Sequence, residues 1–246
     1  MKTVAIVQAR LGSSRLPGKV LQDLAGDTML ARVVARLRAA RTIDDIVIAT
    51  TMNESDDPVV REAARLGVQT WRGSEHNVLA RYIGAARKYY AGAVVRVTSD
   101  CPLLDPETVD RVVTSLRAAT LDYSSNTHVR SYPRGLDVEA FYLETLETIF
   151  RSATSAAAKE HVTAYVMEQP SEFAIHQVTA ATDDSDLRWT VDTAEDLALV
   201  RTLFGELGLA TIRPYREVVA AVRARPELAA INGHITQKNW QDSHVA

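Results

Sequence analysis

The chain opens with TVAIVQARLGSSRLPGK, residues 3–19, in which an apolar run passes directly into a loop. Thr3–Ala9 is β-branched and apolar, which predicts a buried strand. Leu11–Gly18 combines glycine, serine and proline, which is the composition of a loop. Gly12 and Gly18 allow unusual backbone angles and a close approach of N–H groups to a ligand. Since ligands of parallel sheets lie at the carboxyl ends of strands, we expect a ligand site at this loop.

The segments beyond this loop predict an α/β sheet. Apolar runs and helical spacing alternate over residues 1–120, which favours a mostly parallel sheet with helices on both faces. Further strands are expected at 46–51, 68–71 and 94–99, with helices starting near Met29, Asp57, Val78 and Pro106. The less regular second half predicts strands at 136–141, 175–178 and 189–192, and helices at 156–167, 194–207 and 214–224.

The composition and charge of the chain argue against several classes of function. The 246 residues carry a net charge of −3, whereas a non-specific nucleic-acid binder is usually basic. Cys101 is the sole cysteine, which excludes an internal disulfide and a multi-cysteine zinc site. No apolar run approaches the ~20 residues needed to cross a bilayer. We therefore expect a cytoplasmic protein that binds neither nucleic acid nor a membrane, with one domain over 1–236 and a polar tail at 237–246.

The loop carries the groups that a triphosphate requires. Arg10, Arg15 and Lys19 supply cations, and Ser13 and Ser14 supply hydroxyl donors. Guanidinium forks, a point-charge ammonium and backbone N–H groups together suit a chain of phosphates. The P-loop motif fails, because five residues separate the two glycines and a valine replaces its magnesium-binding hydroxyl. The alternative is a solvated turn with surface arginines.

Two aspartates near predicted strand ends are candidates for holding Mg²⁺, which nucleotidyl transfer needs. Asp100 directly follows the strand at 94–99, although it could instead cap the next helix. Asp192 precedes the helix at 194–207. There Asp192 or Thr193 could cap that helix, with an acidic residue of its first turn closing a capping box.

Other polar segments have weaker signals. In RGLDVE, residues 134–139, period two would place Asp137 and Glu139 on one strand face, although this could be an ordinary polar face. His161 lies in KEHVT, where a helical histidine is either a ligand contact or structural. The DDSD run at 183–186 has the D-x-D spacing of a metal site but lies in a polar loop, which favours a solvated turn.

Five segments in order resemble the CMP-sugar cytidylyltransferase family, which includes the CMP-acylneuraminate and CMP-KDO synthetases. The pattern Ala9-Arg10-x-x-Ser13-x-Arg15-x-x-x-Lys19 resembles its N-terminal signature, closest to the spore coat polysaccharide type. The other four segments are SDCPLL at 99–104, GLDVE at 135–139, KEHVT at 159–163 and WTVDTAEDL at 189–197. Ser99 stands where the family has glycine, Thr98 where the KDO enzymes have glutamine, and Ala194 where the family has proline.

The resemblance implies a Rossmann-like nucleotide-diphospho-sugar transferase (GT-A-like) fold. It also implies a Mg²⁺-dependent enzyme that activates an acidic sugar with CTP, releases pyrophosphate and serves surface polysaccharide biosynthesis. Relatives imply a homodimer through residues near 123–165, within a dimerisation and acceptor-binding extension at roughly 123–180.

The resemblance assigns roles residue by residue. Arg15, Lys19 and Asp100 would be catalytic, and Asp100 and Asp192 would bind metal. The nucleotide would contact Ala9, Arg10, Gly12, Ser13, Ser14, Arg15 and Lys19. The acceptor would contact Arg134, Asp137, Glu139 and His161.

Three rival functions stay open at this point. A GT-A glycosyltransferase would have D-x-D after the fourth strand, where the chain has Ser99-Asp100-Cys101. A cytidylyltransferase with a non-sugar acceptor such as a phosphonate would share every motif above. A non-catalytic nucleotide-binding protein would be favoured by loss of Lys19 or Asp100, and both are present.

Overall fold

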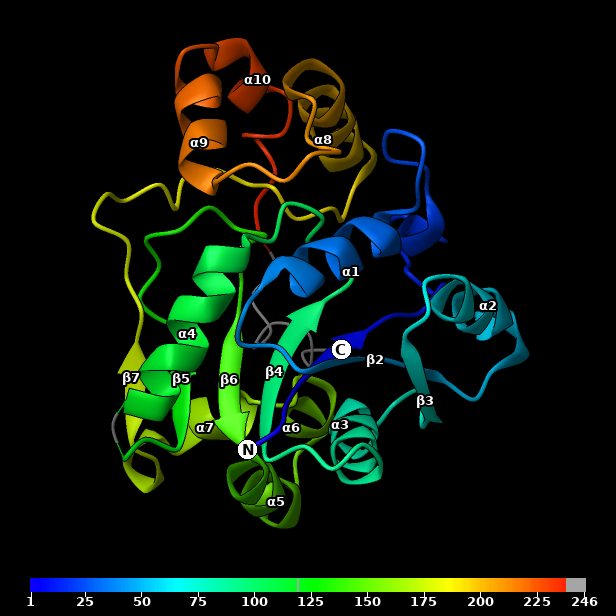
Figure 1. Ribbon diagram of the computed structural model, residues 1–246, viewed down its shortest axis with the longest axis vertical. Helices are drawn as coiled ribbons and strands as arrows, with labels where there is room; N and C mark the ends of the chain where they lie inside the picture. Colours follow the sequence, from blue (N-terminus) through cyan, green and yellow to red (C-terminus); the bar gives the residue numbers. More distant parts are fainter. Residues whose placement is uncertain (119, 238–246) are drawn as a thin grey trace.

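A computed structural model describes residues 1–118 and 120–237, which form one seven-stranded sheet (Figure 1). The predicted tail lies outside the described residues except for Gln237. The strand order across the sheet is β3-β2-β1-β4-β6-β5-β7. The strands are β1 (Thr3–Gln8), β2 (Asp45–Thr51), β3 (Gln69–Gly73), β4 (Ala93–Thr98), β5 (Tyr123–Ser125), β6 (Glu139–Tyr142) and β7 (Ile175–Gln177).

The first four strands are parallel, as predicted, and β6 reverses the direction. β1 pairs in parallel with β2 and with β4, and β2 pairs in parallel with β3. β6 is antiparallel to both β4 and β5. The amino end of β6 therefore reaches the same edge of the sheet as the carboxyl ends of β1 and β4.

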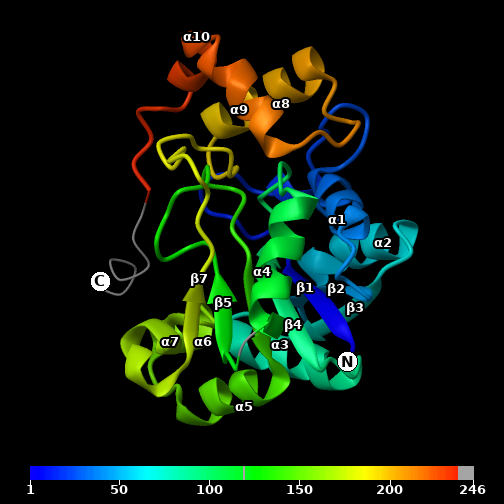
Figure 2. The ribbon, with the colours of Figure 1, turned by 60° about the vertical axis from the view of Figure 1, so that its left-hand side comes forward.

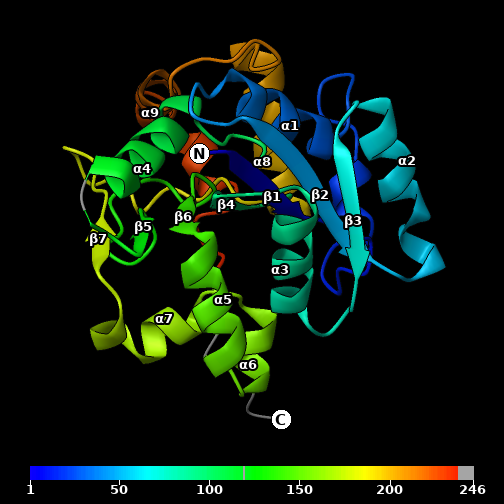
Figure 3. The same cartoon turned by 60° about the horizontal axis from the view of Figure 1, so that its bottom comes forward.

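Helices cover both faces of the sheet, which explains why β1 is apolar along its whole length. Ala5 and Val7 pack into a core with three helices on one face, whereas Val4 and Ile6 pack into a second core on the other. Figure 3 shows α1 and α2 on one side of the sheet and α3 and α5 on the other. The helices of the first face are α1 (Met29–Ala39), α2 (Asp57–Arg65) and α4 (Pro106–Ala118); those of the second are α3 (Val78–Lys88), α5 (Leu143–Ser152), α6 (Ala156–Glu160) and α7 (Ala164–Glu168). This confirms the predicted mostly parallel mixed sheet between helical layers.

A third apolar core lies beyond the carboxyl ends of β1 and β4 (Figures 1 and 2). It packs the buried Trp189 against α8 (Ala194–Leu207), α9 (Tyr215–Arg223) and α10 (Pro226–Ala230). Three short 3₁₀ helices complete the secondary structure: η1 (Lys19–Leu21), η2 (Glu54–Asp56) and η3 (Pro170–Glu172).

Two secondary-structure predictions were wrong. The helix expected at 156–167 is split into α6 and α7, because Val162 between them has a φ of 47° that no helix continues. The strand expected at 189–192 forms no ladder. Instead Arg134 and Arg188 form an isolated bridge, and the Trp189 N–H donates to the Arg134 carbonyl at 2.6 Å.

Gly135 is required where these two segments lie side by side. Its φ is +104°, and a Cβ there would lie 2.6 Å from the backbone N of Thr190. Gly135→Ala combines backbone strain with a clash against main chain, so we expect it to destabilise the fold by at least ~1–3 kcal/mol. Urea unfolding followed by circular dichroism measures this change.

Gly205→Ala is the matched control. Gly205 lies inside α8, and a methyl group added there would have nothing within 4 Å, so alanine should stabilise the helix by about 0.5–1 kcal/mol. If Gly135→Ala unfolds at the wild-type midpoint, the contact between these two segments does not depend on this glycine.

Candidate active site

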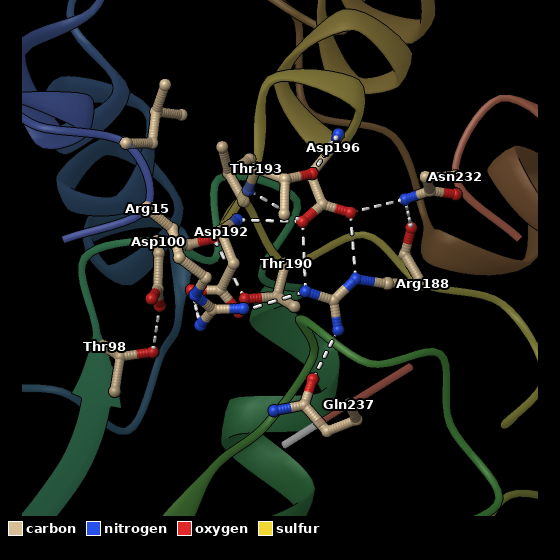
Figure 4. A network of polar contacts seen from close by, with 12 residues as sticks. Arg15, Thr98, Asp100, Arg188, Thr190, Asp192, Thr193, Asp196, Asn232 and Gln237 are labelled. Atoms are coloured by element: carbon tan, nitrogen blue, oxygen red, sulfur yellow. Dashed lines mark hydrogen bonds and ion pairs between the residues drawn. The ribbon is translucent and has the colours of Figure 1, made fainter. Parts of the chain in front are cut away.

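Three charged side chains from distant parts of the chain converge at the carboxyl ends of β1 and β4. The Lys19 Nζ lies 2.8 Å from Asp100 Oδ2 and 2.9 Å from Asp192 Oδ1. It also donates to the Val191 carbonyl at 2.8 Å. Arg15 approaches the same Asp192 Oδ1 at 3.1 Å (Figure 4). The residues predicted as metal ligands and as phosphate contacts are therefore brought together.

The loop after β1 places Lys19 there by closing on itself. The Gly18 N–H donates to the Leu11 carbonyl at 3.0 Å, and the Leu11 N–H donates to the Asp56 carboxylate at 2.7 Å. Gly18 has φ +70° and precedes η1, which begins at Lys19. A positive φ is accessible to glycine without steric cost, so the loop can turn sharply and direct Lys19 inward.

The charges of this cluster stabilise one another. Burial lowers the pKa of Lys19, but Asp100 and Asp192 outweigh burial and raise it above its ordinary value. Burial raises the pKa of Asp192, but Lys19, Arg15 and Arg188 together hold it below its ordinary value. Lys19 is thus an ammonium and Asp192 a carboxylate at neutral pH.

The helix-capping roles considered for Asp100 and Asp192 are filled by neighbouring residues. Thr193 caps α8 and forms a capping box with Asp196, which leaves the Asp192 side chain to face Lys19. The helix after β4 is capped by Asp105, whose carboxylate accepts from the Thr108 N–H at 2.8 Å. Asp100 accepts from the Thr98 hydroxyl at 2.5 Å instead.

A cavity of about 850 Å³ opens beside this cluster. The loop after β1, the end of β4, the start of α3 and the turn around α6 line it. Two of its lining residues form an ion pair, with Arg10 Nη1 3.3 Å from Glu75 Oε1. Predicted site residues in its lining are Ala9, Arg10, Gly12, Ser13, Ser14, Arg15, Lys19, Asp100 and His161. The predicted nucleotide-binding residues therefore share one wall.

Some residues that line the cavity could not be recognised as site residues from the sequence. Glu75 and Asn77 lie in the polar loop between β3 and α3, and Arg81 lies on α3 with an exposed fraction of 2%. Arg81 donates to the Ser74 carbonyl at 2.7 Å. Polar residues before a helix are so often caps, as Asn77 is for α3, that their pattern alone does not mark a site.

The predicted acceptor residues are divided among different environments. Asp137 forms two 3.0 Å hydrogen bonds with Arg130. Arg134 is half-buried, and none of the described residues forms a hydrogen bond or ion pair with its guanidinium. Burial and the neighbouring Arg130 and Arg188 lower the pKa of Arg134. Of these residues, His161 alone lies in the described lining of the cavity.

Glu139 is buried, and both oxygens of its carboxylate have partners. It pairs with Arg96 across the β4–β6 ladder and accepts hydrogen bonds from the hydroxyls of Tyr123 and Thr163, the latter at 2.6 Å. Although burial raises the pKa of Glu139, Arg96 and these donors lower it below its ordinary value. Thr163 follows the strained Val162, so Glu139 anchors the turn that presents His161.

We predict that Glu139→Gln destabilises the protein by about 3 kcal/mol, because it leaves the Arg96 charge without its buried partner. It should also raise amide hydrogen exchange in residues 160–164, which lose their anchor. Glu144→Gln, at an exposed position on the neighbouring helix α5, is the control and should stay within about 0.5 kcal/mol of wild type. Unchanged exchange in residues 160–164 would contradict the anchoring role.

The two aspartates fit a divalent cation. Asp100 Oδ2 and Asp192 Oδ1 both lie within 2.9 Å of the Lys19 Nζ, so the two carboxylate oxygens lie close together around one positive charge. The described residues contain no group of three or more His, Cys, Asp or Glu side chains able to hold a metal. Mg²⁺ commonly uses one or two protein carboxylates and completes its shell with phosphates and water, so this donor set suits a metal–nucleotide complex.

The cytidylyltransferase family model matches residues 4–215. This chain belongs to the cytidylyltransferase family. The spore coat polysaccharide biosynthesis protein SpsF of Bacillus subtilis is 30% identical over 231 residues, covering 91% of this chain and 95% of that protein. The 3-deoxy-manno-octulosonate cytidylyltransferase of Anaeromyxobacter dehalogenans is 38% identical over 122 residues, which is 48% of this chain and 49% of that enzyme. A solved cytidylyltransferase from Leptospira borgpetersenii is similar with a TM-score of 0.90 and 29% identity, covering 97% of this chain and 100% of that one.

These comparisons confirm the predicted family, fold and enzyme class. The cytidylyltransferase is a CTP-dependent nucleotidyltransferase, which sets aside the glycosyltransferase and the non-catalytic binding protein. The roles of the individual site residues stay predictions. Within residues 1–118 and 120–237, no helix is both long and apolar enough to cross a membrane.

Proposed function

We propose that this cytidylyltransferase transfers CMP from CTP to an oxygen of an acidic sugar and releases pyrophosphate. The convergence of Lys19, Asp100 and Asp192 beside a cavity lined by the loop after β1 is the observation that carries the proposal. This convergence puts cationic side chains, which suit phosphates, next to a pair of carboxylates, which suit Mg²⁺.

In the proposed reaction, the acceptor oxygen attacks the α-phosphorus of CTP as the bond to the β-phosphate oxygen breaks and pyrophosphate leaves. Arg15 and Lys19 face the β- and γ-phosphates and neutralise the charge that builds on the leaving group. Asp100 and Asp192 would hold a divalent cation, which would offset the negative charge of the phosphates. The loop N–H groups and the serines orient the nucleotide.

Arg134 supports an acidic acceptor. Its half-buried guanidinium forms no hydrogen bond or ion pair with any described residue, whereas Arg130 and Arg188 nearby are already paired with aspartates. A carboxylate matches the fork of an unpaired guanidinium. The 3-deoxy-manno-octulosonate enzyme acts on such an acid by its name. We propose the same class of acceptor here, with Asp137 and His161 as further contacts, in polysaccharide biosynthesis as the name of SpsF suggests. We further propose a cytoplasmic homodimer formed through residues near 123–165.

A screen of the four nucleoside triphosphates against a panel of sugar acids and phosphonates, with Mg²⁺ present, tests the proposal through released pyrophosphate. We expect turnover with CTP and one or more sugar acids. Asp100→Asn should lower kcat by at least about 100-fold, because one of the two oxygens facing the cation loses its charge. Turnover only with a phosphonate acceptor would overturn the sugar assignment, and wild-type turnover by Asp100→Asn would overturn the metal assignment.

Arg134→Met tests the acceptor site separately. Loss of a charge-assisted bidentate contact, about 1.5–3 kcal/mol, should raise KM for the sugar acid by about 10–100-fold and leave KM for CTP unchanged. Arg151→Met, at an exposed position on α5, is the control and should change neither constant. An equal rise of both KM values in Arg134→Met would place this arginine outside the acceptor site.

A further inference from the structure

Asp196 makes more contacts than a helix cap requires. It is fully buried, and a capping box needs its side chain to reach only the backbone of Thr193, which it does at 3.1 Å. Asp196 also accepts from the Asp192 N–H at 2.9 Å, from Asn232 Nδ2 at 2.8 Å, and from Arg188 Nε and Nη2 at 2.8 and 3.0 Å (Figure 4). These additional contacts come from Asp192 itself and from Arg188 and Asn232, which are hydrogen-bonded to each other.

Arg188 connects this buried cap to the predicted metal ligand. Its Nη2 lies 3.0 Å from Asp192 Oδ2 while its fork is fixed on Asp196. Asn232 donates to the Arg188 carbonyl at 2.9 Å, and Gln237 accepts from Nη1. Arg188 is 6% exposed and Asn232 is 2% exposed. The Arg188 guanidinium is therefore held in place by contacts other than the one with Asp192.

The two oxygens of Asp192 consequently have different surroundings. Oδ1 faces Lys19 at 2.9 Å and Arg15 at 3.1 Å, on the side of the nucleotide loop. Oδ2 is held by Arg188 on the opposite side. A carboxylate free to rotate could present either oxygen, or both, to a cation.

We infer that Arg188 and Asp196, supported by Asn232, are positioning residues that fix Asp192 so that Oδ1 alone faces the cation. The inference rests on the proposed role of Asp192 as a metal ligand. Mg²⁺ demands near-ideal octahedral geometry, and a carboxylate locked to one oxygen satisfies it better than one able to chelate with both. Groups that hold a metal ligand in place typically change metal affinity by 10–100-fold when removed.

Arg188→Lys tests the inference because it keeps the charge and removes the fork. A lysine is a point charge without the planar fork, so it does not reproduce the two-oxygen contact with Asp196 together with the contact with Asp192. We expect Mn²⁺ affinity, measured by the electron paramagnetic resonance of free Mn²⁺ without nucleotide, to fall at least 10-fold. The Mg²⁺ concentration for half-maximal turnover should rise to a similar degree, with KM for CTP at saturating Mg²⁺ changed less than twofold.

Thr193→Ala is the matched control. It removes the hydroxyl that caps α8 and leaves every contact of Asp192 in place. It should lower Tm and leave Mn²⁺ affinity within twofold of wild type. If Arg188→Lys lowers Tm in the same way with unchanged Mn²⁺ affinity, Arg188 has a structural role only and the inference is wrong.

Asn232→Ala gives a second, milder variant should Arg188→Lys fail to fold. It removes two hydrogen bonds from the support of Arg188, so Mn²⁺ affinity should fall by a factor between those of Thr193→Ala and Arg188→Lys. Wild-type affinity in a folded Asn232→Ala would overturn the inference in that case. A wild-type protein that binds no Mn²⁺, with or without CTP, would instead overturn the metal site of the proposed function, and the inference with it.

Discussion

The ammonium of Lys19 between Asp100 and Asp192 joins three parts of the chain that are far apart in sequence. Each of these charges is costly to bury alone, since burial disfavours the charged form of every one of them. Together they offset that cost, and the raised pKa of Lys19 shows that the two carboxylates outweigh burial. The loop after β1, the end of β4 and the segment before α8 are consequently held at one point, which fixes the position of the loop after β1.

The reversed direction of β6 determines which residues lie next to the cluster of Lys19, Asp100 and Asp192. In an all-parallel sheet the amino end of this strand would lie at the far edge. Because β6 is antiparallel to β4, the segment leading into it, with Arg134 and Asp137, approaches the same edge as Asp100. At the first residue of the strand, Glu139 already pairs with Arg96 in the ladder and is buried. Within RGLDVE, Asp137 therefore stays a predicted acceptor contact, whereas Glu139, two positions later, is a buried structural residue.

Sequence reasoning succeeded where a local signal and the final environment agree. The apolar strand, the glycine-containing loop and the aspartate after β4 predicted the parallel half of the sheet and the place of Lys19 and Asp100, because both follow from short-range pattern. Glu139 shows the limit. Period two predicts a shared face with Asp137, but only the β4–β6 register shows that Arg96 lies opposite. The pairing of Arg188 with Asp196 carried no signal either, although a capping box at this helix start was predicted, since packing of the C-terminal helices brings Arg188, Asp196 and Asn232 together.

The protonation states at the cluster indicate what kind of catalysis it can supply. A general base works best with a pKa near the operating pH. The pKa of Asp192 is held low by Lys19, Arg15 and Arg188, and that of Lys19 is raised by the two aspartates, so neither is suited to exchange protons at neutral pH. Both are instead fixed charges in a partly buried setting, where electrostatic effects are stronger than in water. Such an arrangement favours transfer chemistry driven by positioning and charge neutralisation, which makes the orientation of Asp192 more important than its basicity.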